Sequence, residues 1–201
     1  MTDKKIQFAI AVLILFLCSS FTGGEAISIS EAIHNNLISV TVQGKKTIAS
    51  GESSHYGQCI TMTITNLTSN DISVKLEAGR YFDSEDQSVQ DMIVTKESGL
   101  KLGPKKAGTF QVYAMCGQKT NSAPSPESKF KIGKLCSGAL LGLAKLINNR
   151  NYQNATAQSA VWAFTNNASI ENIQSADNEM ERVLVTYVCK GKKIALPEKY
   201  R

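Results

Sequence analysis

Residues 59–65 read CITMTIT and form the clearest strand pattern in the chain. Ile60, Met62 and Ile64 alternate with threonines, which places apolar side chains on one face and hydroxyl groups on the other. A strand with one apolar face has to bury that face against a second layer. The stretch therefore predicts an antiparallel sheet with one buried face and one solvated face.

Segments of the same kind lie on both sides of this strand. They cover residues 37–42, 72–76, 89–95, 100–102 and 109–115. Residues 81–86 interrupt them with an acidic stretch that is interpreted as a loop. Because no helical pattern separates the segments, we predict an antiparallel, Ig-like β-sandwich of about six or seven strands.

The hydrophobic period changes after residue 133. Leu135, Ala139, Leu143 and Ile147 recur at helical spacing, and residues 155–164 form a second helical stretch. The predicted architecture is one α+β domain in which two or three C-terminal helices pack beside the sandwich. The expected domain covers residues 27–201, with the β-sandwich part at 27–133 and the mainly helical part at 134–201.

The first 26 residues have the order of a secretion signal. Lys4 and Lys5 precede an apolar run over residues 6–18, and small residues, including Gly24 and Ala26, follow it. We therefore expect a cleavable signal peptide and an exported protein located in the periplasm, at the cell surface or outside the cell.

The apolar run is too short for a membrane anchor. A spanning helix needs about 20 apolar residues, and no later segment approaches that length, so no transmembrane span is expected after cleavage. Cys18 leaves a lipid anchor open as an alternative. Leu17 argues against lipidation, because the residue before a lipidated cysteine is usually small.

Export determines how the remaining cysteines are interpreted. These are Cys59, Cys116, Cys136 and Cys189. An even number in an exported chain predicts disulfides, and strand order favours the pairs Cys59–Cys116 and Cys136–Cys189. Because the spacing contains neither a C-x-x-C motif nor paired histidines, we expect no zinc site. No cofactor is expected.

The positive charge is spread thinly along the chain. The formal net charge is +5, but the lysines occur only in short pairs such as Lys45-Lys46 and Lys105-Lys106. A nucleic-acid-binding protein usually gathers basic residues on one face. We therefore do not expect nucleic acid as a partner.

Candidate catalytic and metal-binding residues are few. His55 lies in a loop and the chain has no G-x-S-x-G motif, so a hydrolase that uses His55 is the least favoured alternative and a non-enzymatic protein is expected. Four acidic residues could supply oxygen ligands to calcium, although their spacing departs from the EF-hand pattern. They are Asp83, Glu85, Asp86 and Asp91; the alternative is an ordinary solvated acidic loop.

Several segments resemble exported bacterial β-sandwich proteins that have no assigned activity. The resemblance rests on GQCITMTITNL at residues 57–67, GRYF at 79–82 and QDMIV at 90–94. In those proteins a cysteine, here Cys116, ends the last strand, and a Gln-x-Ala-Val-Trp helix, here residues 158–162, follows. The resemblance implies a binding or structural module of the cell envelope or exterior with an unknown partner there.

Contacts with such a partner are expected from exposed loops on the rigid sheet. The two candidate loops cover residues 81–91 and 117–127.

The QSAVW segment is also similar to part of the thioester domains of bacterial surface adhesins. In those domains a glutamine near the start of a helix is cross-linked to a cysteine, and the resulting electrophile captures host amines. The resemblance implies a Cys116–Gln158 thioester here, although Met115 and Gly117 differ from the bulky residues that flank the adhesin cysteine. The alternative is that Trp162 packs on the sheet and Gln158 lies at the surface one turn earlier.

Overall fold

A computed structural model describes residues 26–46 and 49–201. The expected signal peptide, apart from Ala26, and Cys18 lie outside the described residues. The strands are β1 (Ile27–Ser28), β2 (Ile38–Gly44), β3 (Tyr56–Asn66), β4 (Ile72–Leu76), β5 (Arg80–Ser84), β6 (Met92–Val94), β7 (Ser98–Leu102), β8 (Ala107–Cys116) and β9 (Lys129–Leu135). The α-helices are α1 (Ile29–His34), α2 (Gly138–Arg150), α3 (Ala155–Thr165) and α4 (Asn178–Lys192), and two short 3₁₀ helices are η1 (Ile170–Asn172) and η2 (Glu198–Tyr200).

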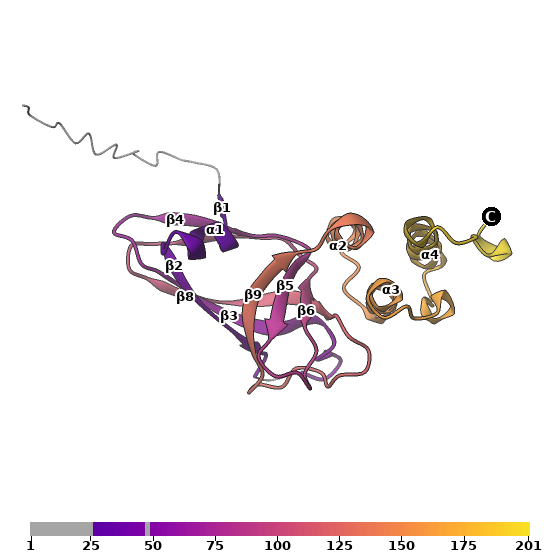
Figure 1. The fold of residues 1–201 in the computed structure, drawn as a ribbon, viewed down its shortest axis with the longest axis horizontal. Helices are drawn as coiled ribbons and strands as arrows, with labels where there is room; N and C mark the ends of the chain where they lie inside the picture. The colour runs from indigo at the N-terminus through magenta and orange to yellow at the C-terminus, as the bar shows by residue number, and fades with distance from the viewer. Residues whose placement is uncertain (1–25, 47–48) are drawn as a thin grey trace, which may run out of the picture.

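A closed barrel forms the centre of the protein (Figure 1). Its strands follow the order β2-β3-β8-β6-β5-β9, and each neighbouring pair is antiparallel. β2 and β9 close the ring through a short contact that pairs Val42 with Phe130 and Gln43 with Lys129. As expected, Ile60, Met62 and Ile64 on β3 are buried in the barrel core.

The predicted Ig-like sandwich is wrong, and β5 is the reason. Residues 81–84 were expected to form part of an acidic loop, but they belong to a strand that pairs with β6 on one side and β9 on the other. Phe82 at the middle of β5 is fully buried in the barrel core. Because β5 connects β6 to β9, the sheet closes on itself instead of separating into two layers.

A smaller mixed sheet and α1 lie at the end of the barrel away from the C-terminal helices (Figure 1). β1 pairs with β4 in parallel, and β4 pairs with β7 antiparallel. The Ser28 side chain caps α1 by accepting a hydrogen bond from the Glu31 N–H at 3.2 Å. Ile29 and Ala32 on α1 complete this end of the barrel core.

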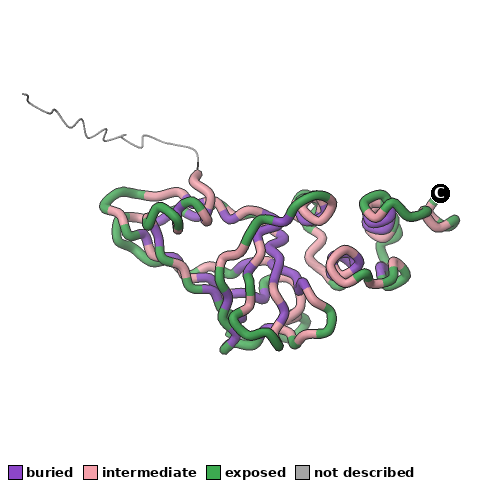
Figure 2. Tube along the Cα trace, in the orientation of Figure 1, coloured by how far each residue is buried: buried purple, intermediate pink, exposed green. Residues whose placement is uncertain are grey.

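The helices α2, α3 and α4 pack together beside the barrel and form a second core with its outer face (Figure 1). The alternation of side chains along β8 separates the two cores: Ala114 and Cys116 point into the barrel, whereas Met115 points toward the helices. Figure 2 shows buried residues along the barrel strands and on one side of each of these helices. Within the described ranges, none of the helices is both long enough and apolar enough to cross a membrane.

The expected disulfides are not formed. In the part of the chain that the structure describes, all four cysteines are buried free thiols. β3 begins at Tyr56, before Cys59, and its register with β8 shifts between Gly57 and Ile60. The shift directs the Cys59 thiol toward the Ala114 carbonyl at 3.5 Å and places His55, not Cys59, opposite Cys116.

The second predicted pair is not formed either: Cys136 and Cys189 both belong to the helical core, but each is a free thiol. Cys136 lies between β9 and α2, beside Tyr81 of β5, whereas Cys189 lies near the end of α4.

Candidate functional site

Cys116 is the last residue of β8, and its side chain is fully buried. β6 lies on one side of it, where Met92 is its paired residue. On the other side, its backbone N–H donates to the His55 carbonyl at 3.0 Å. The strand thus ends inside the protein with its terminal thiol held between two neighbouring segments.

Gln158 lies in the first half of α3, and only 2% of it is exposed. The helix begins after Asn154, whose side chain caps it by accepting a hydrogen bond from the Ala157 N–H at 3.2 Å. The interpretation that Gln158 lies at the surface is therefore wrong. A buried amide destabilises a protein unless its polar atoms are hydrogen-bonded, so its partners define the site.

Both partners of the Gln158 side chain belong to Cys116. The Cys116 N–H, which also donates to the His55 carbonyl, donates to Gln158 Oε1 at 2.8 Å, and Gln158 Nε2 donates to the Cys116 carbonyl at 2.9 Å. The amide therefore binds the strand end as a neighbouring strand would. This arrangement places the carboxamide carbon of Gln158, an electrophile, against the residue that carries a thiol.

His55 and Trp162 complete the site around the thiol. His55 Nδ1 lies 3.6 Å from Cys116 Sγ. The His55 ring meets the Trp162 ring edge-on, with 6.2 Å between the ring centroids and an interplanar angle of 79°. Trp162 follows Gln158 by one helical turn, so a single face of α3 supplies both the amide and the aromatic support.

One buried donor of the site is unsatisfied. Trp162 Nε1 is buried and has no hydrogen-bond partner within the described part of the chain. Buried polar groups are nearly always paired in folded proteins, so an exception of this kind requires an explanation. It lies beside the place where a thiol, an imidazole and a buried carboxamide meet.

Burial keeps the cysteines protonated. It raises the pKa of the Cys116 thiol, and the neighbouring Cys59 raises it further. Burial likewise raises the pKa of Cys59 to about 12. Since the thiolate is the nucleophilic form of cysteine, Cys116 needs a proton acceptor before it can react.

Asn166 holds the chain that follows Cys116. Its Nδ2 donates to the Gly117 carbonyl at 2.8 Å, and its Oδ1 accepts from the Lys119 N–H at 2.9 Å. Together with Gln158, it ties both ends of α3 to the end of β8. Sequence reasoning missed this residue; its place just after the helix was the sole available signal.

The two loops predicted to contact a partner lie side by side. Val89 and Ser122 form an isolated β-bridge, and Gln90 Nε2 donates to the Asn121 carbonyl at 2.9 Å. Asp91 Oδ2 accepts from Gln118 Nε2 at 2.5 Å. We call residues 87–91 with 117–122 the paired loops; residues 117–122 follow directly after Cys116, whereas residues 81–84 of the first predicted loop belong to β5.

The acidic residues predicted as calcium ligands are used in different ways. Asp91 Oδ1 accepts from the Ser84 N–H at 2.8 Å, Asp86 accepts from the Ser88 N–H and hydroxyl, and Glu85 lies 3.9 Å from Lys131. Asp83 is directed toward Gly133 of β9. Over residues 26–46 and 49–201, no group of three or more His, Cys, Asp or Glu side chains is arranged to hold a metal ion.

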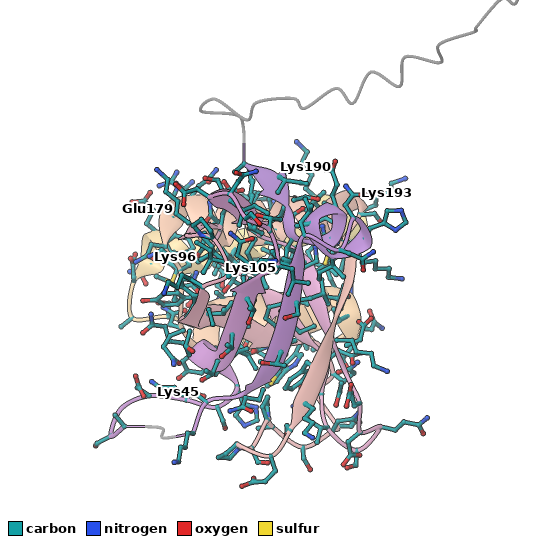
Figure 3. All side chains as sticks on the ribbon, turned by 90° about the vertical axis from the view of Figure 1, so that its left-hand side faces the viewer. Lys45, Lys96, Lys105, Glu179, Lys190 and Lys193 are labelled. Carbon is teal, nitrogen blue, oxygen red and sulfur yellow. The ribbon has the colours of Figure 1, made fainter. Side chains whose placement is uncertain are left out.

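The lysines are distributed over several sides of the molecule. Figure 3 shows Lys45 near one end and Lys190 and Lys193 near the other, with Lys96 and Lys105 between them. The expectation that nucleic acid is not a partner still rests on the sequence alone.

Comparison of the chain with protein-family models, curated proteins and solved structures finds no match in any of the three. The site therefore has to be interpreted from its own geometry.

Proposed function

We propose that this protein is an exported binding module that attaches covalently to amine groups of its partner through a thioester between Cys116 and Gln158. The observation that carries the proposal is the double hydrogen bond of the buried Gln158 carboxamide to the main chain of Cys116. Export rests on the predicted signal peptide. The proposal is therefore a covalent form of the binding module expected from the sequence.

The geometry supports a simple internal reaction. Cys116 Sγ attacks the Gln158 Cδ atom, the Cδ–Nε2 bond breaks and ammonia leaves. Negative charge develops on Oε1 during the attack, where the Cys116 N–H already donates at 2.8 Å. A donor fixed at the developing charge is an effective form of transition-state stabilisation, and holding the two groups together removes most of the entropic barrier.

The thioester then serves as a protected electrophile. A primary amine of the partner attacks the acyl carbon, forms an amide with the Gln158 side chain and releases the Cys116 thiol. Because both residues are buried, bulk water has little access to the bond before capture. The paired loops, one of which continues directly from Cys116, are suited to select the partner.

A cysteine hydrolase is the other chemistry that a Cys–His pair allows, and the site favours it less. A hydrolase must bring substrate to its nucleophile in every cycle, and Cys116 has no exposed surface, whereas a thioester has to be reached only once, by the amine that it captures. The raised pKa of the Cys116 thiol is also the opposite of what an activated catalytic cysteine requires. A thioester demands only one internal reaction per molecule.

Intact-mass spectrometry of the purified mature protein tests the proposal. We expect a mass lower than that of the amino-acid sequence by one ammonia, and a covalent adduct after incubation with methylamine that peptide mapping places on residue 158. Cys116→Ala and Gln158→Glu should abolish both signals, whereas the matched control Cys189→Ala should retain them. An unmodified mass together with no methylamine adduct would overturn the proposal.

A further inference from the structure

His55 is held against Cys116 by several independent contacts. Its carbonyl accepts from the Cys116 N–H at 3.0 Å, and its own N–H donates to the Ser53 hydroxyl at 3.0 Å. Its ring rests edge-on against Trp162. These contacts leave Nδ1 as the ring atom that faces Cys116 Sγ, at 3.6 Å.

The thiol needs such a neighbour. Cys116 is buried among apolar side chains, which favours its protonated form. The protonated thiol is a poor nucleophile, and the amide nitrogen of Gln158 is a poor leaving group unless it gains a proton. A single group that accepts the first proton and donates the second would resolve both difficulties.

We propose that His55 is a catalytic residue that moves this proton during formation of the Cys116–Gln158 thioester. The inference rests on the proposed function and adds to it the residue that makes the reaction fast. This role requires the tautomer in which the ring proton is on Nε2, so that Nδ1 is free to accept.

The reaction balances with one proton transferred twice. His55 Nδ1 takes the proton from Sγ while Sγ forms a bond with the Gln158 Cδ atom and the carbonyl electron pair moves to Oε1. When that pair returns, the Cδ–Nε2 bond breaks and Nδ1 gives its proton to the departing nitrogen, which leaves as ammonia. His55 ends neutral, and the products are one thioester and one ammonia.

The same residue acts in the capture step. An amine that attacks the thioester has to lose one proton, and Cys116 Sγ has to gain one as it leaves. His55 accepts the first and donates the second, because its Nδ1 is adjacent to the sulfur. The free Trp162 N–H beside the ring is a donor available to the arriving group.

A refolding time course tests this role. The mature chain, recovered unfolded from inclusion bodies, is diluted into native buffer, quenched in acid at intervals and weighed by intact-mass spectrometry to follow ammonia loss. We expect His55→Ala and His55→Asn to form the thioester at least ~100-fold more slowly than the wild type, the scale of general acid–base catalysis. His34→Ala, which removes the other histidine, should react at the wild-type rate.

Two further readouts separate proton transfer from a structural role. Added imidazole should accelerate the His55→Ala reaction, since it supplies the missing base in solution, but it should not affect wild type. His55→Asn retains a hydrogen-bonding side chain near Sγ without a titratable ring, so it remains informative if His55→Ala does not fold. Near-ultraviolet circular dichroism identifies variants that have folded.

The outcomes are distinct. Thioester formation at the wild-type rate in folded His55→Asn would overturn the role of His55 and leave the proposed function intact. Absence of ammonia loss in the wild type would overturn the proposed function and, with it, the role of His55.

Discussion

Gln158 is a polar side chain in a position that an apolar residue would ordinarily occupy. It lies on the buried face of α3 and has both of its hydrogen-bonded atoms on the main chain of one residue, Cys116. A buried group of this kind contributes little net free energy when it is paired and costs more when its partner is removed. The pairing is therefore easiest to detect by breaking it.

Replacing Gln158 with leucine should destabilise the protein by about 1–3 kcal/mol, because the Cys116 carbonyl is left buried without its donor. Urea denaturation measures the change. The comparison is made in a Cys116→Ala background so that no cross-link contributes to stability. An exposed glutamine, Gln174, provides the matched control, and Gln174→Leu should change the free energy of unfolding by less than about 0.5 kcal/mol. Equal effects at the two positions would contradict the pairing.

The free thiols lead to a second prediction. Because none of the four described cysteines is in a disulfide, a phosphine reductant should leave the melting temperature unchanged. Differential scanning calorimetry with and without the reductant checks this; a phosphine is preferred to a thiol, which would attack a thioester. A clear fall in melting temperature on reduction would restore the disulfide interpretation.

At the residue scale, the contact between Cys116 and Gln158 was predicted only from the resemblance to thioester domains. No local pattern joins residues 42 positions apart. His55 was expected only to lie in a loop. Its closeness to Cys116 depends on the register of β3 with β8, which shifts between Gly57 and Ile60. Sequence periodicity predicts which face a side chain takes, but not which residue lies opposite it.

At the scale of elements, β5 decides the architecture. Its sequence, RYFDS, leads into the acidic residues 83–86, whose acidic character led residues 81–86 to be interpreted as a loop. The cost of burying the Arg80 charge is offset by hydrogen bonds: its guanidinium donates to both Glu77 carboxylate oxygens and to the Gly133 carbonyl. These partners come from outside the strand, which is why the local pattern did not reveal it.

Phe82→Ala should therefore destabilise the barrel by about 3–5 kcal/mol, the usual cost of removing a fully buried phenylalanine. Phe110, which is only partly buried on β8, serves as the control, and Phe110→Ala should cost clearly less. Guanidinium denaturation followed by circular dichroism measures both variants. A smaller effect at Phe82 than at Phe110 would contradict the assignment of β5 as a central barrel strand.

α3 holds the end of β8 at two points, which predicts how the site moves. Asn166→Ala removes the clamp on Gly117 and Lys119, so the Lys119 amide should exchange with deuterium faster. Mass spectrometry of peptides that cover residues 117–122 measures the rate. Asn172→Ala, at an exposed asparagine of η1, should leave that rate unchanged. Unchanged exchange in Asn166→Ala would show that the paired loops are held without α3.

For the whole molecule, the C-terminal segment provides a response to acid. Glu181 of α4 accepts hydrogen bonds from the Tyr200 hydroxyl and Lys199 Nζ, and from the Ser175 N–H. These contacts, that of Tyr200 first, lower the pKa of Glu181 to about 2. A carboxyl whose pKa falls on folding stabilises the native state above its unfolded pKa and loses that contribution as pH falls through the folded value.

Docking of η2 on α4 should accordingly weaken between about pH 4.5 and pH 2. Hydrogen exchange of residues 194–201, measured across this range, should accelerate at the acidic end. Glu181→Gln, which cannot ionise, should remove the pH dependence over the same interval. If wild type and Glu181→Gln respond identically, the carboxylate does not control docking.

The order of strands first and helices after them could be predicted from the sequence, but the closure of the sheet into a barrel could not. Alternation over residues 59–65 and the helical period after residue 133 reflect local burial, which the sequence records directly. Closure of the barrel depends on pairing between strands that are far apart in the sequence. β2 and β9 are such a pair, and only two residue pairs join them. Nothing in the pattern of either strand distinguishes a sandwich edge from a barrel seam.

Cys116 belongs to the barrel core, and Gln158 belongs to the helical part. On the proposed chemistry, the free protein carries a strap between its two halves, and capture of an amine exchanges that strap for a tether to the partner. After the exchange, a pulling force on the partner enters through α3 and no longer through a bond to β8. The barrel is then joined to the tethered helices only by the chain after β9 and by non-covalent packing, so the same event that fastens the partner also loosens the protein that holds it.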